Sequence, residues 1–238
     1  MIVRNKHGEK IDYVLHDAER DDVLVILGHG VTGNKDRPLC IGVAERLAAA
    51  GWPTMRLSFA GNGDSDGKFE EATIPKEVDD LHAVLDQVKG SKKIVYIGHS
   101  MGGAVGALAA AKDDRISVLV SLAGMVRTKA FCEAEFGDVT PGEGYMWDDE
   151  DCPLSQEYVD SMHLIDTTLT AARDIRAPWL ILHGDADDVV LPQDSEDLFR
   201  TLRGKKKHVV IEGANHVFEG CYDQLAEEIE TWLQLHVK

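Results

Sequence analysis

The chain has 238 residues, 44% of them hydrophobic, which suits one domain with a sizeable core. Lys and Arg number 25 against 42 Asp and Glu, so the formal net charge of −17 disfavours nucleic acid and anionic membrane surfaces as partners. The first ten residues are polar, and no stretch approaches the roughly 18 apolar residues of a membrane span. We therefore expect a cytoplasmic protein with small-molecule partners.

Apolar, β-branched runs alternate with helical segments, the pattern of a mostly parallel sheet covered on both faces. Strands are expected near residues 11–15, 23–27, 54–59, 94–97, 116–122, 179–183 and 208–211, with an antiparallel edge strand at 2–4. Apolar residues recur every three or four positions over 74–88 and 218–232, which predicts amphipathic helices. Two helix starts are expected where a capping oxygen precedes a proline, at Asp36 and at Thr73.

Residues 28–33, Gly-His-Gly-Val-Thr-Gly, follow a predicted strand and match the spacing of a dinucleotide-binding loop. This match supports one alternative of a different class, a nucleotide-binding α/β protein. Residues 34–38 separate the loop from the next helix, and the strand over 54–59 ends without the acidic residue that would hold a ribose. Both features make nucleotide binding the weaker interpretation.

The loop over residues 60–67 is rich in Gly, Asn and Asp and matches the first half of a calcium-binding loop. Such a loop needs a bidentate glutamate at its twelfth position, which here is Thr73. The four cysteines are scattered, without a C-x-x-C pair or metal-ligand spacing, and no H-E-x-x-H occurs. We expect a structural turn at 60–67, free thiols, and no metal or prosthetic group.

Residues 94–103 read Ile-Val-Tyr-Ile-Gly-His-Ser-Met-Gly-Gly, a strand that turns at Ser100 into a helix. The G-x-S-x-G spacing is that of a nucleophile elbow, in which flanking glycines permit a sharp turn that exposes the serine. Because a serine hydroxyl is a poor nucleophile at neutral pH, Ser100 would need a histidine base and a carboxylate to orient it. The alternative is a glycine-rich loop before an ordinary helix, since this short motif also occurs by chance.

Candidates for both partners follow Ser100 at the ends of later strands. The strand over 179–183 runs into a group of carboxylates that contains Asp185, Asp187 and Asp188, and the strand over 208–211 runs into a loop that carries His216. Two other histidines, His99 and His183, lie beside the motifs, and we interpret them as packing or loop-orienting residues. The predicted order of serine, acid and histidine is that of one class of serine hydrolases.

These motifs resemble those of the α/β-hydrolase superfamily over nearly the whole chain. His-Gly-x-x-Asp-x-x-Val resembles the acid loop of the family and implies Asp187, whereas Gly-x-x-His-x-Phe resembles its histidine loop and implies His216. The triad would then be Ser100, Asp187 and His216, with the backbone N–H groups of Met101 and Val31 as the oxyanion hole. The implied fold is an α/β-hydrolase fold with a mostly parallel sheet of about eight strands.

About 55 residues separate the strands that end near 123 and begin at 179, longer than a plain connection. We expect one domain over 1–238 in which residues 124–178 form a lid or cap insertion. This segment carries aromatic residues, among them Tyr145 and Trp147. Our hypothesis is that these two bind substrate, and the alternative is that they anchor the insertion to the body.

Three stretches together resemble the small lidded carboxylesterases that include cinnamoyl and feruloyl esterases: His-Gly-Val-Thr-Gly-Asn-Lys, Arg-Leu-Ser-Phe-Ala-Gly-Asn-Gly-Asp-Ser-Asp-Gly-Lys-Phe and Gly-His-Ser-Met-Gly-Gly. The resemblance implies a serine carboxylesterase that hydrolyses small carboxylic esters without a cofactor, with aromatic, cinnamoyl- or feruloyl-like esters as one option. Alternatives are a monoacylglycerol or lysophospholipid lipase, an aminopeptidase-like hydrolase and a non-catalytic binding protein. Nothing in the residues indicates an oligomeric state.

Overall fold

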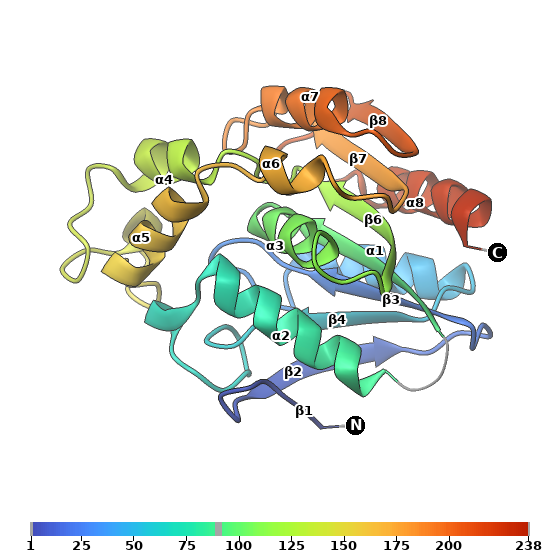
Figure 1. Cartoon of the computed structure of the whole chain (residues 1–238), viewed down its shortest axis with the longest axis horizontal. Helices are drawn as coiled ribbons and strands as arrows, with labels where there is room; N and C mark the ends of the chain where they lie inside the picture. The colour runs from blue at the N-terminus through green and yellow to red at the C-terminus, as the bar shows by residue number, and fades with distance from the viewer. Residues whose placement is uncertain (1, 89–91, 238) are drawn as a thin grey trace.

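The computed structural model describes residues 2–88 and 92–237. Its centre is an eight-stranded sheet in the order β1-β2-β4-β3-β5-β6-β7-β8 (Figure 1). The strands are β1 (Val3–Arg4), β2 (Lys10–His16), β3 (Val23–Gly28), β4 (Thr54–Ser58), β5 (Lys93–His99), β6 (Ile116–Leu122), β7 (Trp179–Gly184) and β8 (Lys206–Ile211). β1 and β2 pair antiparallel with their neighbours and the other pairs are parallel, which confirms the predicted sheet and its antiparallel edge strand.

Helices cover both faces of the sheet. They are α1 (Pro38–Ala49), α2 (Ile74–Gln87), α3 (Met101–Ala110), α4 (Thr128–Phe136), α5 (Gln156–Ile165), α6 (Leu169–Ala172), α7 (Pro192–Thr201) and α8 (Tyr222–His236), with short 3-10 turns η1 (Phe69–Glu71) and η2 (Met146–Asp148). Within the described residues, no helix is long and apolar enough to cross a membrane.

The central strand β3 shows why the sheet is covered on both sides. Its residues are all buried, and successive side chains point to opposite faces. Leu24 and Ile26 pack in the core with α2 and α3, whereas Val25 and Leu27 pack in a second core with α1 and α8. A continuous apolar run is therefore required here, rather than an alternation of apolar and polar residues.

One of the two predicted helix starts is correct. Thr73 caps α2 by accepting a hydrogen bond from the backbone N–H of Lys76. Asp36 does not cap α1: the N-cap is Arg37, and no side chain in the described part of the chain caps it. The carboxylate of Asp36 instead contacts Lys35 and Arg56, because these cations compete successfully for it.

Residues 124–178 connect β6 to β7 and contain α4, η2, α5 and α6. In Figure 1, α4 and α5 project beyond one side of the sheet, while α6 lies over the sheet beside α7. α5 contacts η1 and α2 of the body, and Ser155 donates a hydrogen bond to the carbonyl of Glu70 at 2.6 Å. The projecting helices are thus attached to the rest of the domain through α5 and Ser155.

Candidate active site

Ser100 lies in the sharp turn that joins β5 to α3. Its backbone has φ 52° and ψ −119°, a conformation that residues other than glycine rarely adopt. A Cβ on Gly98 would lie 2.2 Å from the carbonyl oxygen of Gly102, and a Cβ on Gly102 would lie 2.6 Å from the carbonyl oxygen of His29. Gly98 therefore permits the turn itself, and Gly102 permits the chain at His29 to pack closely against it.

A cavity of about 560 Å³ opens beside this turn. Ser100 is only 3% exposed, yet it lines the cavity together with His216. The complete lining is His29, Gly30, Val31, Thr32, Gly33, Arg37, Pro38, Leu39, Cys40, His99, Ser100, Trp147, Val189, His216, Val217, Glu219 and Tyr222. Its volume is within the range of small-molecule binding sites.

His216 and Asp187 are hydrogen-bonded to each other. The Nδ1 of His216 lies 2.9 Å from the Oδ2 of Asp187. The two residues follow β8 and β7, which are adjacent parallel strands, so their loops meet at one edge of the sheet. With Nδ1 donating to the carboxylate, Nε2 is the ring nitrogen that can take up a proton.

The carboxylate of Asp187 accepts four hydrogen bonds. Oδ1 accepts from the backbone N–H groups of Val189 and Val190, both at 3.0 Å, and Oδ2 accepts from His216 and from His183 at 3.1 Å. Burial would raise the pKa of Asp187, but the hydrogen bonds from His183 and His216 hold it well below its usual range. Asp187 is thus ionised at neutral pH, as a partner of an imidazolium must be.

The two neighbouring aspartates make no such contact with His216. Asp185 is exposed and accepts a hydrogen bond from the backbone N–H of Gly213 at 2.6 Å, which ties the acid loop to the histidine loop. Asp188 is also exposed. Among these three candidates, the geometry therefore favours Asp187 as the partner of His216.

His99, the residue before Ser100, also contacts His216. Its Nε2 donates to the backbone carbonyl of His216 at 2.9 Å, and the centroids of the two rings lie 4.8 Å apart. Burial lowers the pKa of His99 to about 3, aided by the nearby His216, so the ring is neutral. The sequence interpretation of a loop-orienting role is consistent with this contact.

The loop over residues 29–33 passes directly beside the nucleophile turn. A Cβ on Gly30 would lie 2.7 Å from the Cβ of Ser100 and 3.2 Å from its Oγ. Val31 follows Gly30 and lines the cavity, and Met101 is the buried first residue of α3. Of the two residues predicted to form the oxyanion hole, Met101 thus follows Ser100 directly and Val31 follows the glycine that packs against it.

His29 holds this loop to the end of β4. Its Nδ1 donates to the carbonyl of Gly30 at 2.9 Å, and its Nε2 accepts from the backbone N–H of Phe59 at 3.0 Å. Burial lowers the pKa of His29 to about 4, which matches these roles of a neutral imidazole. The histidine of the His-Gly motif therefore has a structural contact that the sequence alone does not reveal.

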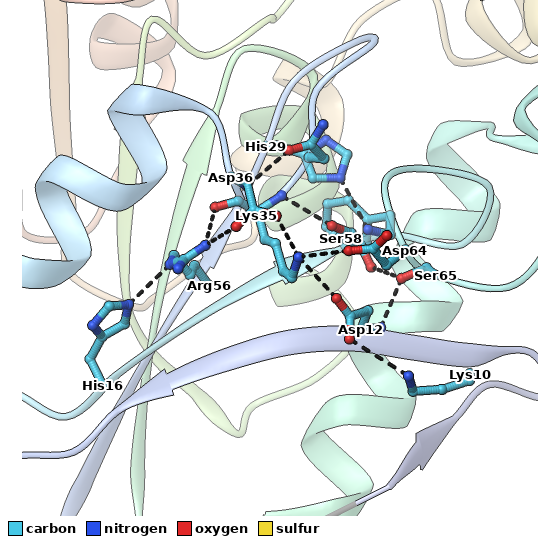
Figure 2. Close-up of polar contacts among 12 residues, drawn as sticks. Lys10, Asp12, His16, His29, Lys35, Asp36, Arg56, Ser58, Asp64 and Ser65 are labelled. Atoms are coloured by element: carbon cyan, nitrogen blue, oxygen red, sulfur yellow. Dashed lines mark hydrogen bonds and ion pairs between the residues drawn. The ribbon is translucent and has the colours of Figure 1, made fainter. Parts of the chain in front are cut away.

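A network of ion pairs anchors the far end of the same loop. Figure 2 shows Lys35 between Asp12, Asp36 and Asp64, with Nζ–O distances of 3.0, 2.5 and 3.2 Å. Arg56 donates to Asp36 and to the carbonyl of Lys35. Burial disfavours the charge of Lys35, but hydrogen bonds to the three carboxylates raise its pKa above the usual range.

The same part of the structure bears on the alternative of nucleotide binding. Helix α1 begins at Pro38, so residues 34–37 separate it from the glycine-rich loop, and Gly30 packs against Ser100. A phosphate-binding turn would lead directly into the helix N-terminus. The geometry does not favour that alternative.

The two aromatic residues proposed for substrate binding differ in position. Trp147, 46% exposed, lines the cavity, and its Nε1 donates to the carboxylate of Glu135 at 2.7 Å. Tyr145 is 41% exposed and forms a β-bridge with Pro153; among the described residues it is not part of the cavity wall. Trp147 alone of this pair is placed to contact a ligand in the cavity.

Many residues of the cavity wall are not predicted from the sequence. Cys40 and Leu39 come from the first turn of α1, and Tyr222 begins α8. A Cβ on Gly42 would lie 2.6 Å from the ring of Tyr222, so this glycine permits the two helices to meet there. No sequence motif identifies these residues, because only the packing of α1 against α8 brings them together.

Comparison with protein families agrees with this architecture. Residues 23–151, more than half of the chain, match the family described as the alpha/beta hydrolase fold. Residues 153–220 match the model described as serine aminopeptidase, S33. The uncharacterized protein YfhR of Salmonella typhimurium is 26% identical over 92% of this chain and 73% of its own length.

Solved structures show the same fold. Est1E from Butyrivibrio proteoclasticus, in a structure with ferulic acid bound, has a TM-score of 0.88 and 26% identity, covering 100% of this chain and 99% of the other. The alpha/beta hydrolase domain-containing protein 10 from mouse has a TM-score of 0.77 at 17% identity over 97% of this chain and 98% of the other. By its family match, its sheet topology and these structural neighbours, the chain belongs to the α/β-hydrolase family.

Proposed function

We propose that the protein is a serine carboxylesterase with Ser100 as nucleophile, His216 as general base and Asp187 as the residue that orients the base. One observation carries this proposal. The Asp187–His216 hydrogen bond, at 2.9 Å, lies beside the cavity that Ser100 and His216 both line. The turn at Ser100 supports it, because its strained backbone is of the kind that presents a nucleophile.

The reaction would proceed in two steps. His216 Nε2 takes the proton of Ser100 as its oxygen attacks the ester carbonyl, and the protonated histidine then gives that proton to the departing alcohol. In the second step His216 takes a proton from water, whose oxygen attacks the acyl group on Ser100. The acid is released and the proton returns to the serine oxygen.

The oxyanion formed in each step would be stabilised by the backbone N–H groups of Val31 and Met101. This assignment is supported by the close approach of Gly30 to Ser100 and by the position of Met101 at the start of α3. Removal of one such donor typically lowers the rate about 10² to 10³-fold. The hydrogen bonds of His29 would keep the loop in place during the reaction.

We further propose that the substrates are esters of small, predominantly apolar acids, including aromatic ones. The cavity is largely walled by apolar side chains such as Val31, Leu39 and Val217. The similarity over the full chain to Est1E, whose structure contains ferulic acid, supports an aromatic acyl group. Residues 124–178 would act as a cap in which Trp147 contacts the substrate, and Trp147→Ala should alter selectivity across acyl lengths.

Amide hydrolysis is the second candidate function. It is favoured by the match of residues 153–220 to the serine aminopeptidase model. The same nucleophile and base would serve both reactions, so the residues of the site do not discriminate between them. Aminoacyl p-nitroanilides assayed beside p-nitrophenyl esters would do so, and a larger kcat/KM on the anilides would replace the ester assignment.

The decisive experiment is Ser100→Ala with a panel of p-nitrophenyl esters and a fluorophosphonate probe. We expect labelling to disappear and kcat to fall by about 10⁴-fold or more, because triad residues act as a unit. Ser117→Ala is the control, since within residues 2–88 and 92–237 this hydroxyl donates a hydrogen bond only to the carbonyl of Arg115. Unchanged turnover of Ser100→Ala would refute the proposal.

A further inference from the structure

His183 is a fully buried residue of β7 that contacts the acid of the proposed triad. Its side chain is 0% exposed, and its Nε2 lies 3.1 Å from the Oδ2 of Asp187. The same nitrogen lies 2.8 Å from the carbonyl oxygen of Val190. The other ring nitrogen, Nδ1, lies 2.6 Å from the hydroxyl oxygen of Ser195 on α7.

The partners of the ring determine where its proton lies. A carboxylate oxygen and a carbonyl oxygen can only accept, so Nε2 must carry the hydrogen that they share. With the single ring hydrogen on Nε2, Nδ1 is an acceptor, and the hydroxyl of Ser195, itself 1% exposed, donates to it. The acceptors on Nε2 thus fix the tautomer in which His183 presents an N–H to Asp187, and Ser195 stabilises that tautomer by donating to Nδ1.

This arrangement places two imidazole donors on one carboxylate oxygen. Oδ2 of Asp187 accepts from both His183 and His216, while Oδ1 is occupied by the N–H groups of Val189 and Val190. The orientation of the carboxylate is therefore determined from both sides. A hydrogen bond from His183 to Oδ2 also withdraws negative charge from that oxygen, so it weakens the attraction of Asp187 for protonated His216.

We infer that His183 and Ser195 are positioning residues for the proposed reaction, which orient Asp187 and limit its basicity toward His216. The inference rests on the proposed function, because it assigns a role relative to that triad. Loss of the His183 donor would leave more negative charge on Oδ2, so protonated His216 would be held more tightly. The base would then become active only at higher pH.

Other titratable or charged groups near His183, Asp187 and His216 could also change the pH at which His216 becomes active. His99 faces His216 and donates to its carbonyl, and Arg37 and Glu219 line the same cavity. His208 on β8 is close enough to His183 to interact with it electrostatically. None of these groups is altered by a change at Ser195, so a shift in that variant would come from the His183–Asp187 contact.

The test compares Ser195→Ala, His183→Gln and His183→Phe with the unaltered protein. Glutamine keeps an N–H donor near the position of Nε2, whereas phenylalanine removes it. Ser121→Ala is the matched control: its buried hydroxyl accepts one hydrogen bond, from Nε1 of Trp179 at 2.9 Å, and does not contact Asp187. The measurements are kcat, KM, the pH profile of kcat/KM on one ester, and thermal unfolding.

We expect Ser195→Ala and His183→Phe to lower kcat about 10-fold with little change in KM, since displaced catalytic groups slow the chemical step. The acid limb of the pH profile should move to higher pH in both, and His183→Gln should restore it toward its original position. If His183→Phe does not fold, Ser195→Ala and His183→Gln still decide the matter.

An unmoved acid limb in Ser195→Ala, with stability reduced as in Ser121→Ala, would show that the pair only contributes to packing and would overturn the inference. Failure of the proposed function gives a different result. In that case Ser100→Ala would keep its turnover, whatever the behaviour of the Ser195 and His183 variants.

Discussion

The Nε2 of His99 donates a hydrogen bond to the backbone carbonyl of His216 at 2.9 Å. His99 ends β5, whereas His216 follows β8, and the sheet places β6 and β7 between these strands. The contact therefore joins two loops that the sheet itself does not connect. It ties the residue next to Ser100 to the backbone of the proposed base.

His99→Ala should remove this connection. We expect kcat for ester hydrolysis to fall about 10-fold, because the base is less well placed. The pH profile between pH 5 and 9 should keep its shape, since the low pKa of His99, about 3, leaves the ring neutral throughout. Steady-state kinetics check this, with His82→Ala on α2 as the control; an equal loss of activity in the control would refute the prediction.

Asp187→Asn should abolish most activity. An amide cannot stabilise the imidazolium, and loss of the acid from such a triad costs about 10⁴-fold in kcat. Asp185→Asn is the control, because that carboxylate binds the backbone of Gly213 instead. Comparable activity of the two variants would contradict the assignment of the acid.

The same substitution should change how stability depends on pH. The folded pKa of Asp187 is lowered, so its contribution is present above the unfolded pKa of about 3.9 and is lost as pH falls through the folded value. The unaltered protein should therefore lose more stability on acidification below about pH 4 than Asp187→Asn does. Thermal unfolding at a series of pH values measures the difference.

Glu77 on α2 should make the stability of the fold depend on pH in the opposite direction to Asp187. It is fully buried, neither carboxylate oxygen has a hydrogen-bond partner among the described residues, and burial raises its pKa well above the usual range. The unfolded chain ionises first as pH rises past about 4.3, so stability declines from there toward the raised folded pKa. Glu77→Gln should thus increase the melting temperature more at pH 8 than at pH 4, and an equal change at both would contradict this.

Lys35 should support both stability and rate. Lys35→Met leaves Asp12, Asp36 and Asp64 without their shared cation, at a cost of about 1–3 kcal/mol because these carboxylates are partly solvated. Since the loop beside Ser100 is anchored there, kcat should fall while KM changes little. Urea unfolding and ester kinetics test this, with Arg200→Met, an exposed ion-pair residue, as the control.

Cys40 should limit the size of the acyl group. It is buried and lines the cavity, so Cys40→Leu should reduce kcat/KM for bulky esters and leave p-nitrophenyl acetate nearly unaffected. Cys132→Leu in α4 is the matched control, a buried cysteine that does not line the cavity. A uniform loss across all esters would indicate general damage instead of a size limit.

The strands and the candidate triad could be predicted because both follow from local patterns. Buried parallel strands read as continuous apolar runs, and the chemistry-bearing residues follow directly at their ends, as Ser100 and His216 do. The contact of His99 could not be predicted, since its partner His216 lies in a loop distant in the sequence. The partners of His183 are near in sequence, but no pattern indicates that the acid loop folds back onto the ring. The misplaced cap at Asp36 has the same origin: Arg56, from the neighbouring strand, binds that carboxylate.

The attachment of residues 124–178 has a consequence for divergence within the family. The segment leaves from β6 and returns at β7, adjacent strands that pair in register from Leu119 to Leu122. Because these strands are parallel, the segment leaves β6 at the edge of the sheet where Ser100 and His216 follow their strands, and crosses back to the opposite edge to enter β7 at Trp179. Only its first part therefore lies at the site edge, so substrate preference could evolve by exchange of that part while the strands that precede Ser100 and His216 keep their spacing.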